Sequence, residues 1–282
     1  MRDGKKVDTK PINEIDEDKL IRLMVGRDLK DQFPKVEAPI GEEVLRIENF
    51  TSGNTFKNIS FNIHKGEILG LSGLVGAGRT EVARAIFGVD VKDNGTTYIN
   101  GQKVKIHSPK DAMAHGIAFL TEDRKGQGLV LDNTIDFNMN LASLPKCKSG
   151  MLLDPKKLKN KTMENIKKLD LAPPVPNFMV RKLSGGNQQK VVIAKWLNTE
   201  ANIFIFDEPT RGIDVGAKVE VYNVMNELVM NGAAIIMISS ELPEIIGMSD
   251  RIVVMYEGVV TKELKREDAT QENIMLAAAG GL

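Results

Sequence analysis

Short apolar runs alternate along this chain with segments whose apolar residues recur at helical spacing. The runs are four to six residues long and carry little charge, which is typical of strands buried on both faces. They lie at residues 67–72, 117–120, 203–206, 233–238 and 251–255. Residues 80–87, which precede Gly88, and residues 219–229 have the period of helices. Strands that alternate with helices predict a largely parallel α/β sheet with right-handed crossovers.

Three further segments have a different character. Residues 44–48 and 59–63 alternate between apolar and polar positions, and we expect each to be an edge strand. Residues 133–182 are rich in lysine and amphipathic, which favours a helical subdomain inserted in the sheet domain, with its lysines on a solvated face. The apolar positions near helical spacing in this segment are Leu158, Met163, Ile166 and Leu169.

Composition narrows the class of partner. The 282 residues are 42% hydrophobic, enough for a full core, and the 38 basic side chains equal the 38 acidic ones. A net charge of zero provides no field that would attract nucleic acid, so we expect no nucleic-acid partner. The single cysteine, Cys147, excludes an internal disulfide and has no neighbour that would activate a thiolate, so we expect an ordinary thiol.

Nothing in the sequence predicts a membrane-spanning or exported chain. No apolar run approaches the roughly 20 residues that span a bilayer, and residues 1–6 lack the apolar core of a signal peptide. We therefore expect a soluble cytoplasmic chain that reaches a membrane only through partners.

The opening of the chain resembles its ending. The matching pairs are residues 1–4 with 255–258, residues 16–21 with 270–275, and Gly26 with Gly280. Each copy predicts a strand, a turn and a short capped helix. We interpret residues 1–26 as the tail of a preceding related domain, and residues 27–42, which include Pro34 and Pro39, as a linker. A chance match of two short tails is the alternative.

A glycine-rich turn joins the run at 67–72 to the helix that follows. Its glycines allow a tight turn that aims N–H groups at a phosphate, and the helix adds its positive end. Thr80 offers a hydroxyl to Mg²⁺, and the pattern is that of a P-loop with Arg79 in the lysine position. A plain strand-to-helix turn is the alternative. The residues expected to contact ATP here are Gly73, Val75, Gly76, Ala77, Gly78, Arg79, Thr80 and Glu81.

Two carboxylates follow the run at 203–206. Asp207 and Glu208 therefore lie at the carboxyl edge of a buried strand, where α/β sheets bind ligands. Asp207 is expected to hold Mg²⁺ through water, and Glu208 is expected to polarise an attacking water. By itself the pair fits a capped strand end equally well. A P-loop upstream, in the right order, favours a nucleoside-triphosphate site.

A third motif, Leu-Ser-Gly-Gly-Asn-Gln-Gln-Lys at residues 183–190, completes a set that resembles the ATP-binding cassette (ABC) family over about residues 43–280. In this family two cassettes close face to face on two ATP molecules, and each site combines the P-loop of one with the signature loop of the other. The resemblance implies a P-loop NTPase-like, mostly parallel sheet with an antiparallel β subdomain and an inserted helical subdomain at about residues 133–182. It also places a D-loop at residues 211–214 and supports residues 1–26 as the tail of a preceding cassette.

The signature loop is residues 183–188. Ser184 can cap the following helix and also offer its hydroxyl to a γ-phosphate, while Gly185 and Gly186 expose N–H groups at the positive helix end. A role for Ser184 as a cap alone is the alternative. The resemblance implies that the loop meets the ATP of a partner cassette through Ser184, Gly185, Gly186, Asn187 and Gln188.

Three positions depart from the family pattern. Arg79 replaces a lysine, Glu122 stands where a glutamine is expected, and Ser240 stands where a switch histidine is expected. Glu208 is retained, and we expect it to be the catalytic residue. We hypothesise that this cassette binds ATP and Mg²⁺ but hydrolyses ATP slowly, and that its signature loop completes the better site on the partner. The three histidines all lie elsewhere: His64, His107 and His115.

The remaining expectations concern ligands and partners. We expect Thr80, Asp207 and Glu122 to be metal ligands, and Ser240 to contact ATP. The extended motifs and the ending at residues 269–279 resemble the second cassettes of bacterial monosaccharide importers, the ribose type above all, with galactoside and xylose types as close rivals. The partners implied are a first cassette of the same parent protein, membrane permease subunits and an external sugar-binding protein.

The resemblance also implies a location. It places the chain at the cytoplasmic face of the cell membrane and the permease contact near residues 122–128 and 133–144. One alternative is a soluble cassette protein that acts on ribosomes or DNA, which the neutral charge disfavours. The other is a non-catalytic regulatory cassette.

Overall fold

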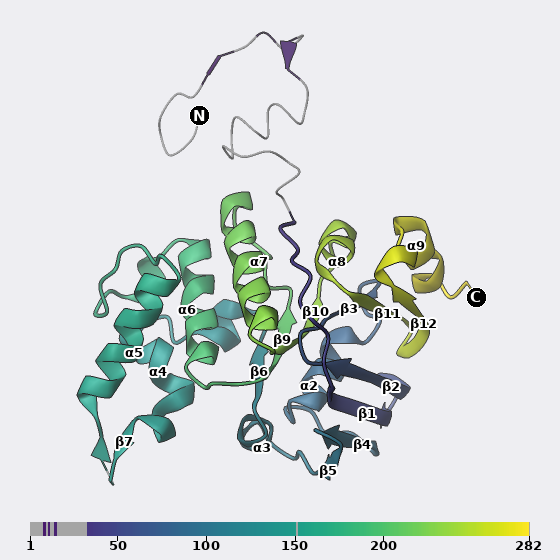
Figure 1. The fold of residues 1–282 in the computed structure, drawn as a ribbon, viewed down its shortest axis with the longest axis horizontal. Helices are drawn as coiled ribbons and strands as arrows, with labels where there is room; N and C mark the ends of the chain where they lie inside the picture. Colours follow the sequence, from purple (N-terminus) through teal and green to yellow (C-terminus); the bar gives the residue numbers. More distant parts are fainter. Residues whose placement is uncertain (1–7, 10, 12–13, 16–32, 151, 282) are drawn as a thin grey trace.

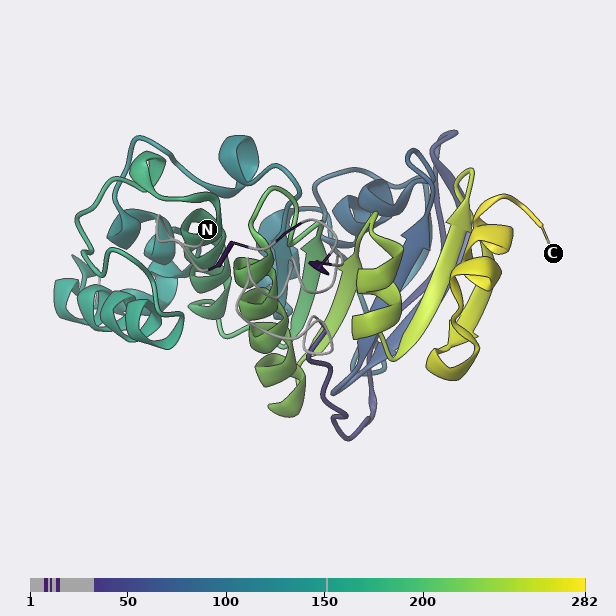
Figure 2. The ribbon, with the colours of Figure 1, turned by 90° about the horizontal axis from the view of Figure 1, so that it is seen from above.

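The larger of the two main sheets carries most of the core. The computed structural model describes residues 8–9, 11, 14–15, 33–150 and 152–281 (Figure 1). The larger sheet has the order β12-β11-β3-β10-β9-β6, parallel except for the β11–β12 pair. Helices lie on both of its faces (Figure 2), so β9 and β10 are buried along their whole length, as their continuous apolar runs predict. Its strands are β3 (Ile68–Gly73), β6 (Ile117–Leu120), β9 (Ile203–Asp207), β10 (Ala234–Ile238), β11 (Arg251–Tyr256) and β12 (Val259–Lys265).

The second sheet is antiparallel, with the order β2-β1-β4-β5. Its strands are β1 (Glu43–Ser52), β2 (Phe56–His64), β4 (Asn94–Ile99) and β5 (Gln102–Val104). The expected antiparallel subdomain is therefore present, and β2 is an edge strand as predicted. The prediction that residues 44–48 form an edge strand was wrong, because β1 pairs on both sides. Its alternation reflects one buried and one exposed face of the sheet, which a central strand can also have.

Residues 133–182 form the expected helical segment, on the far side of the larger sheet from β1 and β2 (Figure 1). Ile166 and Leu169 are buried as predicted, but Met163 is exposed, and Thr162 and Asn165 take the inward positions instead. Polar side chains fit there because each finds a partner, such as Asp136 for the Thr162 hydroxyl. The elements are α4 (Ile135–Asn140), η4 (Leu141–Cys147), β7 (Lys148–Ser149), β8 (Leu152–Leu153), α5 (Pro155–Lys168) and η5 (Val180–Lys182).

The helices around the larger sheet begin at side-chain caps in several cases. Asp214 accepts the N–H of Ala217 at 3.0 Å, and Thr270 accepts that of Asn273 at 3.1 Å, so orphan donors of the first turn are satisfied. The helices and short helical turns are α2 (Arg79–Ile86), α3 (Pro109–Ala114), η3 (Arg124–Gly128), α6 (Gly185–Leu197), α7 (Val215–Met230), α8 (Leu242–Met248), η6 (Arg266–Asp268) and α9 (Gln271–Ala278).

The segment before β1 packs on the cassette rather than running free. Phe33 packs against the ring of Tyr222 with centroids 5.7 Å apart and the ring planes tilted by 46°, and Lys35 forms a 2.7 Å ion pair with Asp250. These contacts fix the second half of the predicted linker between α7 and α8. Almost all of the predicted tail at 1–26 lies outside the described residues. Its C-terminal counterpart has the expected strand, turn and capped helix, in β11 and α9.

Candidate functional site

The P-loop connects β3 to α2 at the carboxyl edge of the larger sheet. Gly73 has φ +152°, and a Cβ there would lie 2.4 Å from the carbonyl oxygen of Met255, so only glycine fits. Gly76 has φ +85° and faces open space. The turn therefore presents its backbone to solvent at the N-terminal end of α2, which is the arrangement that binds phosphates.

Arg79, the residue in the P-loop lysine position, points into the protein. It is 8% exposed, and its Nη1 donates to the carbonyl oxygen of Ser239 at 2.8 Å. Burial lowers the pKa of Arg79, although Glu208 and Asp207 oppose that shift. The guanidinium thus spans from the P-loop to the end of β10, a reach that its length and planar donors allow.

Thr80 and Asp207 lie together beneath the P-loop. The Thr80 hydroxyl donates to Asp207 Oδ1 at 3.2 Å, while Asp207 Oδ2 is buried and has no hydrogen-bond partner. Burial raises the pKa of Asp207 to about 6, with a smaller contribution from Glu208. An unpartnered buried carboxylate oxygen beside a hydroxyl fits Mg²⁺, which sites of this kind hold through one or two protein oxygens together with phosphates and waters.

Glu208 lies at the strand end beside Asp207, in a backbone conformation with φ +47° that glutamate rarely adopts. Its N–H donates to the carbonyl oxygen of Ile238 at 2.9 Å, and its carboxylate accepts the Ser240 hydroxyl at 3.1 Å. Burial raises the pKa of Glu208, against the effect of the Ser240 hydrogen bond. Ser240, at the position where a histidine was expected, therefore contacts the predicted catalytic carboxylate directly.

These groups line one cavity of about 430 Å³. The P-loop forms one wall, Glu208 and Ser240 form another, and Glu122 and Arg211 stand at its side. The lining residues include every predicted ATP contact of the P-loop except Gly73, which supports the turn from behind. Within the described residues, no group of three or more His, Cys, Asp or Glu side chains could hold a metal by itself.

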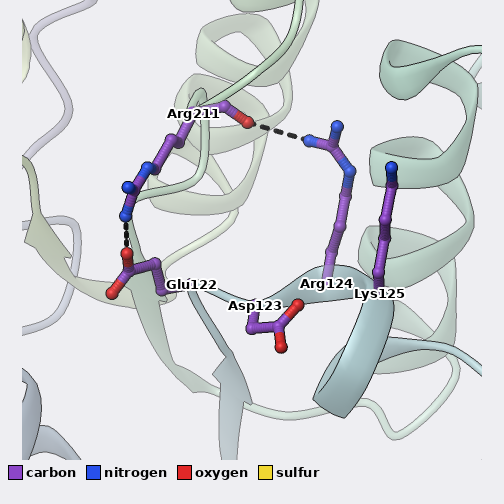
Figure 3. A pocket seen from close by; sticks show the side chains of 5 residues that line it. All are labelled: Glu122, Asp123, Arg124, Lys125 and Arg211. Carbon is purple, nitrogen blue, oxygen red and sulfur yellow. Dashed lines mark hydrogen bonds and ion pairs between the residues drawn. The ribbon is translucent and has the colours of Figure 1, made fainter.

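An adjoining cavity of about 320 Å³ is lined by Glu122, Asp123, Arg124, Lys125 and Arg211 (Figure 3). Arg211 turns its guanidinium onto the Glu122 carboxylate, and Arg124 Nη1 donates to the Arg211 carbonyl oxygen at 2.9 Å. Arg124 Nη2 donates to the carbonyl oxygen of Gly212, also at 2.9 Å. The expected metal ligand Glu122 thus lies beside the ATP cavity with its charge paired to Arg211.

The predicted signature loop lies outside the P-loop cavity of its own chain. Ser184 is exposed and caps α6 by accepting the N–H of Asn187 at 3.4 Å. The Asn187 side chain donates to the Ser184 hydroxyl oxygen at 3.0 Å and accepts the N–H of Ala172 at 2.9 Å. Gly185 is half-buried, with Arg124 and the Gly212 carbonyl each 2.9 Å from where a Cβ would be. The outer end of this loop is therefore free to meet another molecule.

The inner residues of the loop support it from behind. A Cβ on Gly186 would lie 2.8 Å from that of Ala217, so a glycine lets α6 approach α7. Gln188, predicted to meet a partner's ATP, is 5% exposed and donates to the carbonyl oxygens of Val180 and Leu183 at 3.3 and 3.4 Å. The amide thus faces inward and holds the loop.

Sequence reasoning missed the roles of several charged residues near the site. Arg124 lies in a charged stretch that resembles ordinary surface, the predicted D-loop gives Arg211 no partner, and Glu244 follows a proline with no motif around it. The cysteine and the histidines, which were expected to have no role in the site, lie away from it. Cys147 is buried, and the three histidines, His64, His107 and His115, lie outside the cavity.

Comparison with known proteins identifies the family. The family described as ABC transporter matches residues 56–211, more than half of the chain. The chain belongs to the ABC transporter family. The cassette is similar in fold to a crystal structure of an ATP-binding cassette of an ABC transporter in its ADP conformation, with a TM-score of 0.73 and 20% identity, over 85% of this chain and all of the other. The α/β fold of an ABC ATPase expected from the motifs is thus confirmed.

Curated relatives match the cassette along its entire length. It is 53% identical over 281 residues to a putative ribose/galactose/methyl galactoside import ATP-binding protein of Rhizobium etli, and 49% identical over 281 residues to the ribose import ATP-binding protein of Bacillus subtilis. The alignments cover 100% of this chain but 54% and 57% of those proteins, so the cassette spans about half their length. Among the described residues, no helix is both long and apolar enough to cross a membrane.

Proposed function

We propose that this chain is the second of two ABC cassettes in a longer protein that uses ATP to power import of a monosaccharide, with ribose as the leading candidate. The relatives are named for import of ribose or galactosides, and the chain matches about half of each. One observation carries the proposal. The P-loop cavity lies apart from the exposed Ser184 and the half-buried Gly185 beside it, so a complete site would need a second cassette.

Within its own cavity, the chain provides groups for binding and for activating water. The P-loop N–H groups and the positive end of α2 would hold the phosphates, with Thr80 and Asp207 beneath them. Bound Mg²⁺ would neutralise charge that develops on the phosphate oxygens. Glu208 would orient and accept a proton from the attacking water, which its raised pKa favours. Glu122 is paired with Arg211, so we assign it to the cavity wall rather than to the metal.

The same geometry supports the hypothesis of a weak site. Arg79 directs its guanidinium at the Ser239 carbonyl rather than into the cavity, and Ser240 is too short to span the distance that a histidine side chain covers. In the full-length parent, Glu208→Gln should therefore cost less single-turnover hydrolysis than the matching change in the first cassette. Equal losses would contradict the asymmetry.

The signature loop offers a direct test of the shared site. Ser184→Arg adds bulk and charge at the exposed tip, so the parent protein should lose most of its ATP turnover, on the order of 100-fold. The control Ser184→Ala removes only the hydroxyl and should cost far less. Because Ser184 also caps α6, unfolding of all three proteins should be measured alongside. Full turnover by a folded arginine variant would contradict the shared site.

Import and location can be tested in cells. We propose attachment to the cytoplasmic face of the membrane through a permease that docks near residues 122–128 and 133–144, where Phe137 and Leu141 are exposed apolar side chains. An external sugar-binding protein would supply the sugar to the permease. Cells that lack the gene should lose uptake of labelled ribose and regain it with the full-length parent. Rescue of galactose or xylose uptake instead would identify a different sugar.

A further inference from the structure

Glu244, on α8, is a buried carboxylate that no motif of the family pattern described above accounts for. It is 1% exposed and accepts four hydrogen bonds. The donors are the hydroxyls of Thr210 at 2.6 Å, Tyr222 at 2.6 Å and Ser239 at 2.7 Å, and the ammonium group of Lys218 at 3.1 Å. A carboxylate buried with this many donors ties together the segments that carry them.

The donors come from the segments that flank the ATP cavity. Thr210 lies two residues after Glu208, in the turn that follows β9. Ser239 precedes Ser240 at the end of β10 and accepts, through its carbonyl oxygen, the hydrogen bond from Arg79. Tyr222 and Lys218 lie on α7, which begins directly after the predicted D-loop at 211–214. One side chain therefore joins both catalytic turns to α7.

The ionised state of Glu244 favours its hydrogen bonds to these donors. Burial disfavours its ionised form, but the hydrogen bonds from Thr210, Tyr222 and Ser239 and the positive charge of Lys218 outweigh burial and lower the pKa of the carboxyl group. An ionised carboxylate holds hydroxyl donors more strongly than a neutral acceptor would.

The two turns that Glu244 contacts, at Glu208 and at Ser240, have backbone conformations that depend on local hydrogen bonds. Glu208 holds its left-handed backbone conformation with two main-chain hydrogen bonds: its N–H donates to the Ile238 carbonyl oxygen at 2.9 Å, and its own carbonyl oxygen accepts the N–H of Arg211 at 3.2 Å. The Ser239 hydroxyl oxygen also accepts the N–H of Glu241 at 3.0 Å, which shapes the turn that presents Ser240. Loss of the carboxylate would release the Thr210 and Ser239 hydroxyls together.

We propose that Glu244 is a positioning residue for ATP hydrolysis, which fixes the Glu208 turn and the Ser240 turn relative to each other and to α7. The part of this inference that concerns ATP hydrolysis rests on the proposed function. The geometric claim, that Glu244 immobilises the two turns, stands independently of any activity.

The test compares Glu244→Gln with Glu227→Gln in the full-length parent. Glu227 is on α7, where it is half exposed and forms an ion pair with Lys168. It does not line the P-loop cavity, so Glu227→Gln controls for replacing a carboxylate by an amide. Tyr222→Phe removes a single donor and should give a smaller effect than Glu244→Gln. The measurements are hydrogen exchange of peptides from residues 205–212 and 238–243, the Kd for Mg-ATP, and single-turnover hydrolysis.

We expect Glu244→Gln to speed exchange in both turns by about tenfold or more, with exchange in β1 unchanged. Hydrolysis that depends on Glu208 should fall by about 10- to 100-fold, while the Kd for Mg-ATP changes less than about threefold. Exchange as slow as in the wild type would overturn the proposal, and so would faster exchange across the whole sheet, which would indicate a general loss of stability.

The two ideas fail separately. If the Glu208→Gln variant hydrolyses ATP as fast as the wild type, catalysis at this cassette is refuted, and the exchange data still decide whether Glu244 fixes the turns. If Glu244→Gln loosens the turns without slowing hydrolysis that depends on Glu208, the positioning role is refuted while the proposed ATPase stands.

Discussion

Asp207 should weaken the fold of the nucleotide-free protein, and its replacement should strengthen that fold. The carboxyl group is 1% exposed, and its Oδ2 has no partner. Burial raises its pKa from an ordinary value of 3.8 to about 6. One pKa unit corresponds to about 1.4 kcal/mol, so an ionised Asp207 lowers the free energy of unfolding by about 3 kcal/mol at neutral pH.

The sign and the pH window follow from that shift. Because the pKa of Asp207 is higher in the folded state, the folded protein binds more protons between about pH 4 and pH 6. The group therefore costs nothing below about pH 4, and stability is lost progressively as the pH rises to about 6, beyond which the cost is constant. Asp207→Asn has no such proton to lose and keeps an oxygen for the Thr80 hydroxyl.

Urea unfolding of the chain in EDTA, followed by fluorescence of the single tryptophan, Trp196, measures this effect. The asparagine variant should be more stable than the wild type by about 2–3 kcal/mol at pH 7.5, and the gap should close towards pH 4. Mg-ATP at 100 times its Kd for the wild type should close most of this gap, because it adds about 2.7 kcal/mol to the wild type and less to a variant that binds Mg-ATP more weakly. A variant that is less stable at every pH, by a constant amount, would refute this reasoning.

Two other buried contacts lead to predictions of the same kind. Burial lowers the pKa of Lys195 to about 8, below its unfolded value, so this group's contribution to stability rises between about pH 8 and pH 10.5. As the pH rises from 7.5 to 10, the free energy of unfolding of the wild type should therefore increase by about 2–3 kcal/mol relative to that of Lys195→Met. Urea unfolding in which both proteins change equally with pH would contradict this. Phe33→Ala removes the ring that packs on Tyr222 and should cost about 1–2 kcal/mol, while proteolysis near residue 33 becomes faster. Unchanged proteolysis would mean that the docked segment is held by Lys35 and Asn226 alone.

Local signals in the sequence predicted the elements of this fold and the outline of its site. The strand β9 and its acidic end, the glycines of the P-loop and the Ser184 cap each depend on a few adjacent residues, and a short window of sequence contains the whole signal. Asp207 and Thr80, 127 residues apart, could be paired in advance because the carboxyl ends of parallel strands meet at one edge of the sheet.

What the sequence did not predict depends on contacts between distant side chains. The pairing of β1 on both edges is decided by where β4 returns, and an alternating pattern cannot report that. Arg124 reaches residues that are 87 and 88 positions away, at Arg211 and Gly212. The same holds for Gln188, whose amide resembles an exposed motif residue in the sequence and is buried only because residues 180–183 fold back over it. No periodicity specifies such partners.

The contacts of Arg124 join regions that the sequence pattern treats as separate. Its guanidinium donates to both carbonyl oxygens at the start of the predicted D-loop, and its Nη2 lies 2.9 Å from where a Cβ on Gly185 would be. These bonds are charge-assisted, and they join the turn at residues 122–128 to the start of the predicted D-loop. A displacement of the turn at 122–128, near the proposed permease contact, must therefore either break these bonds or carry the start of the predicted D-loop with it. If the chain assembles as we propose, Arg124 would connect the permease side of the cassette to the segment that follows Glu208 and lies beside Gly185.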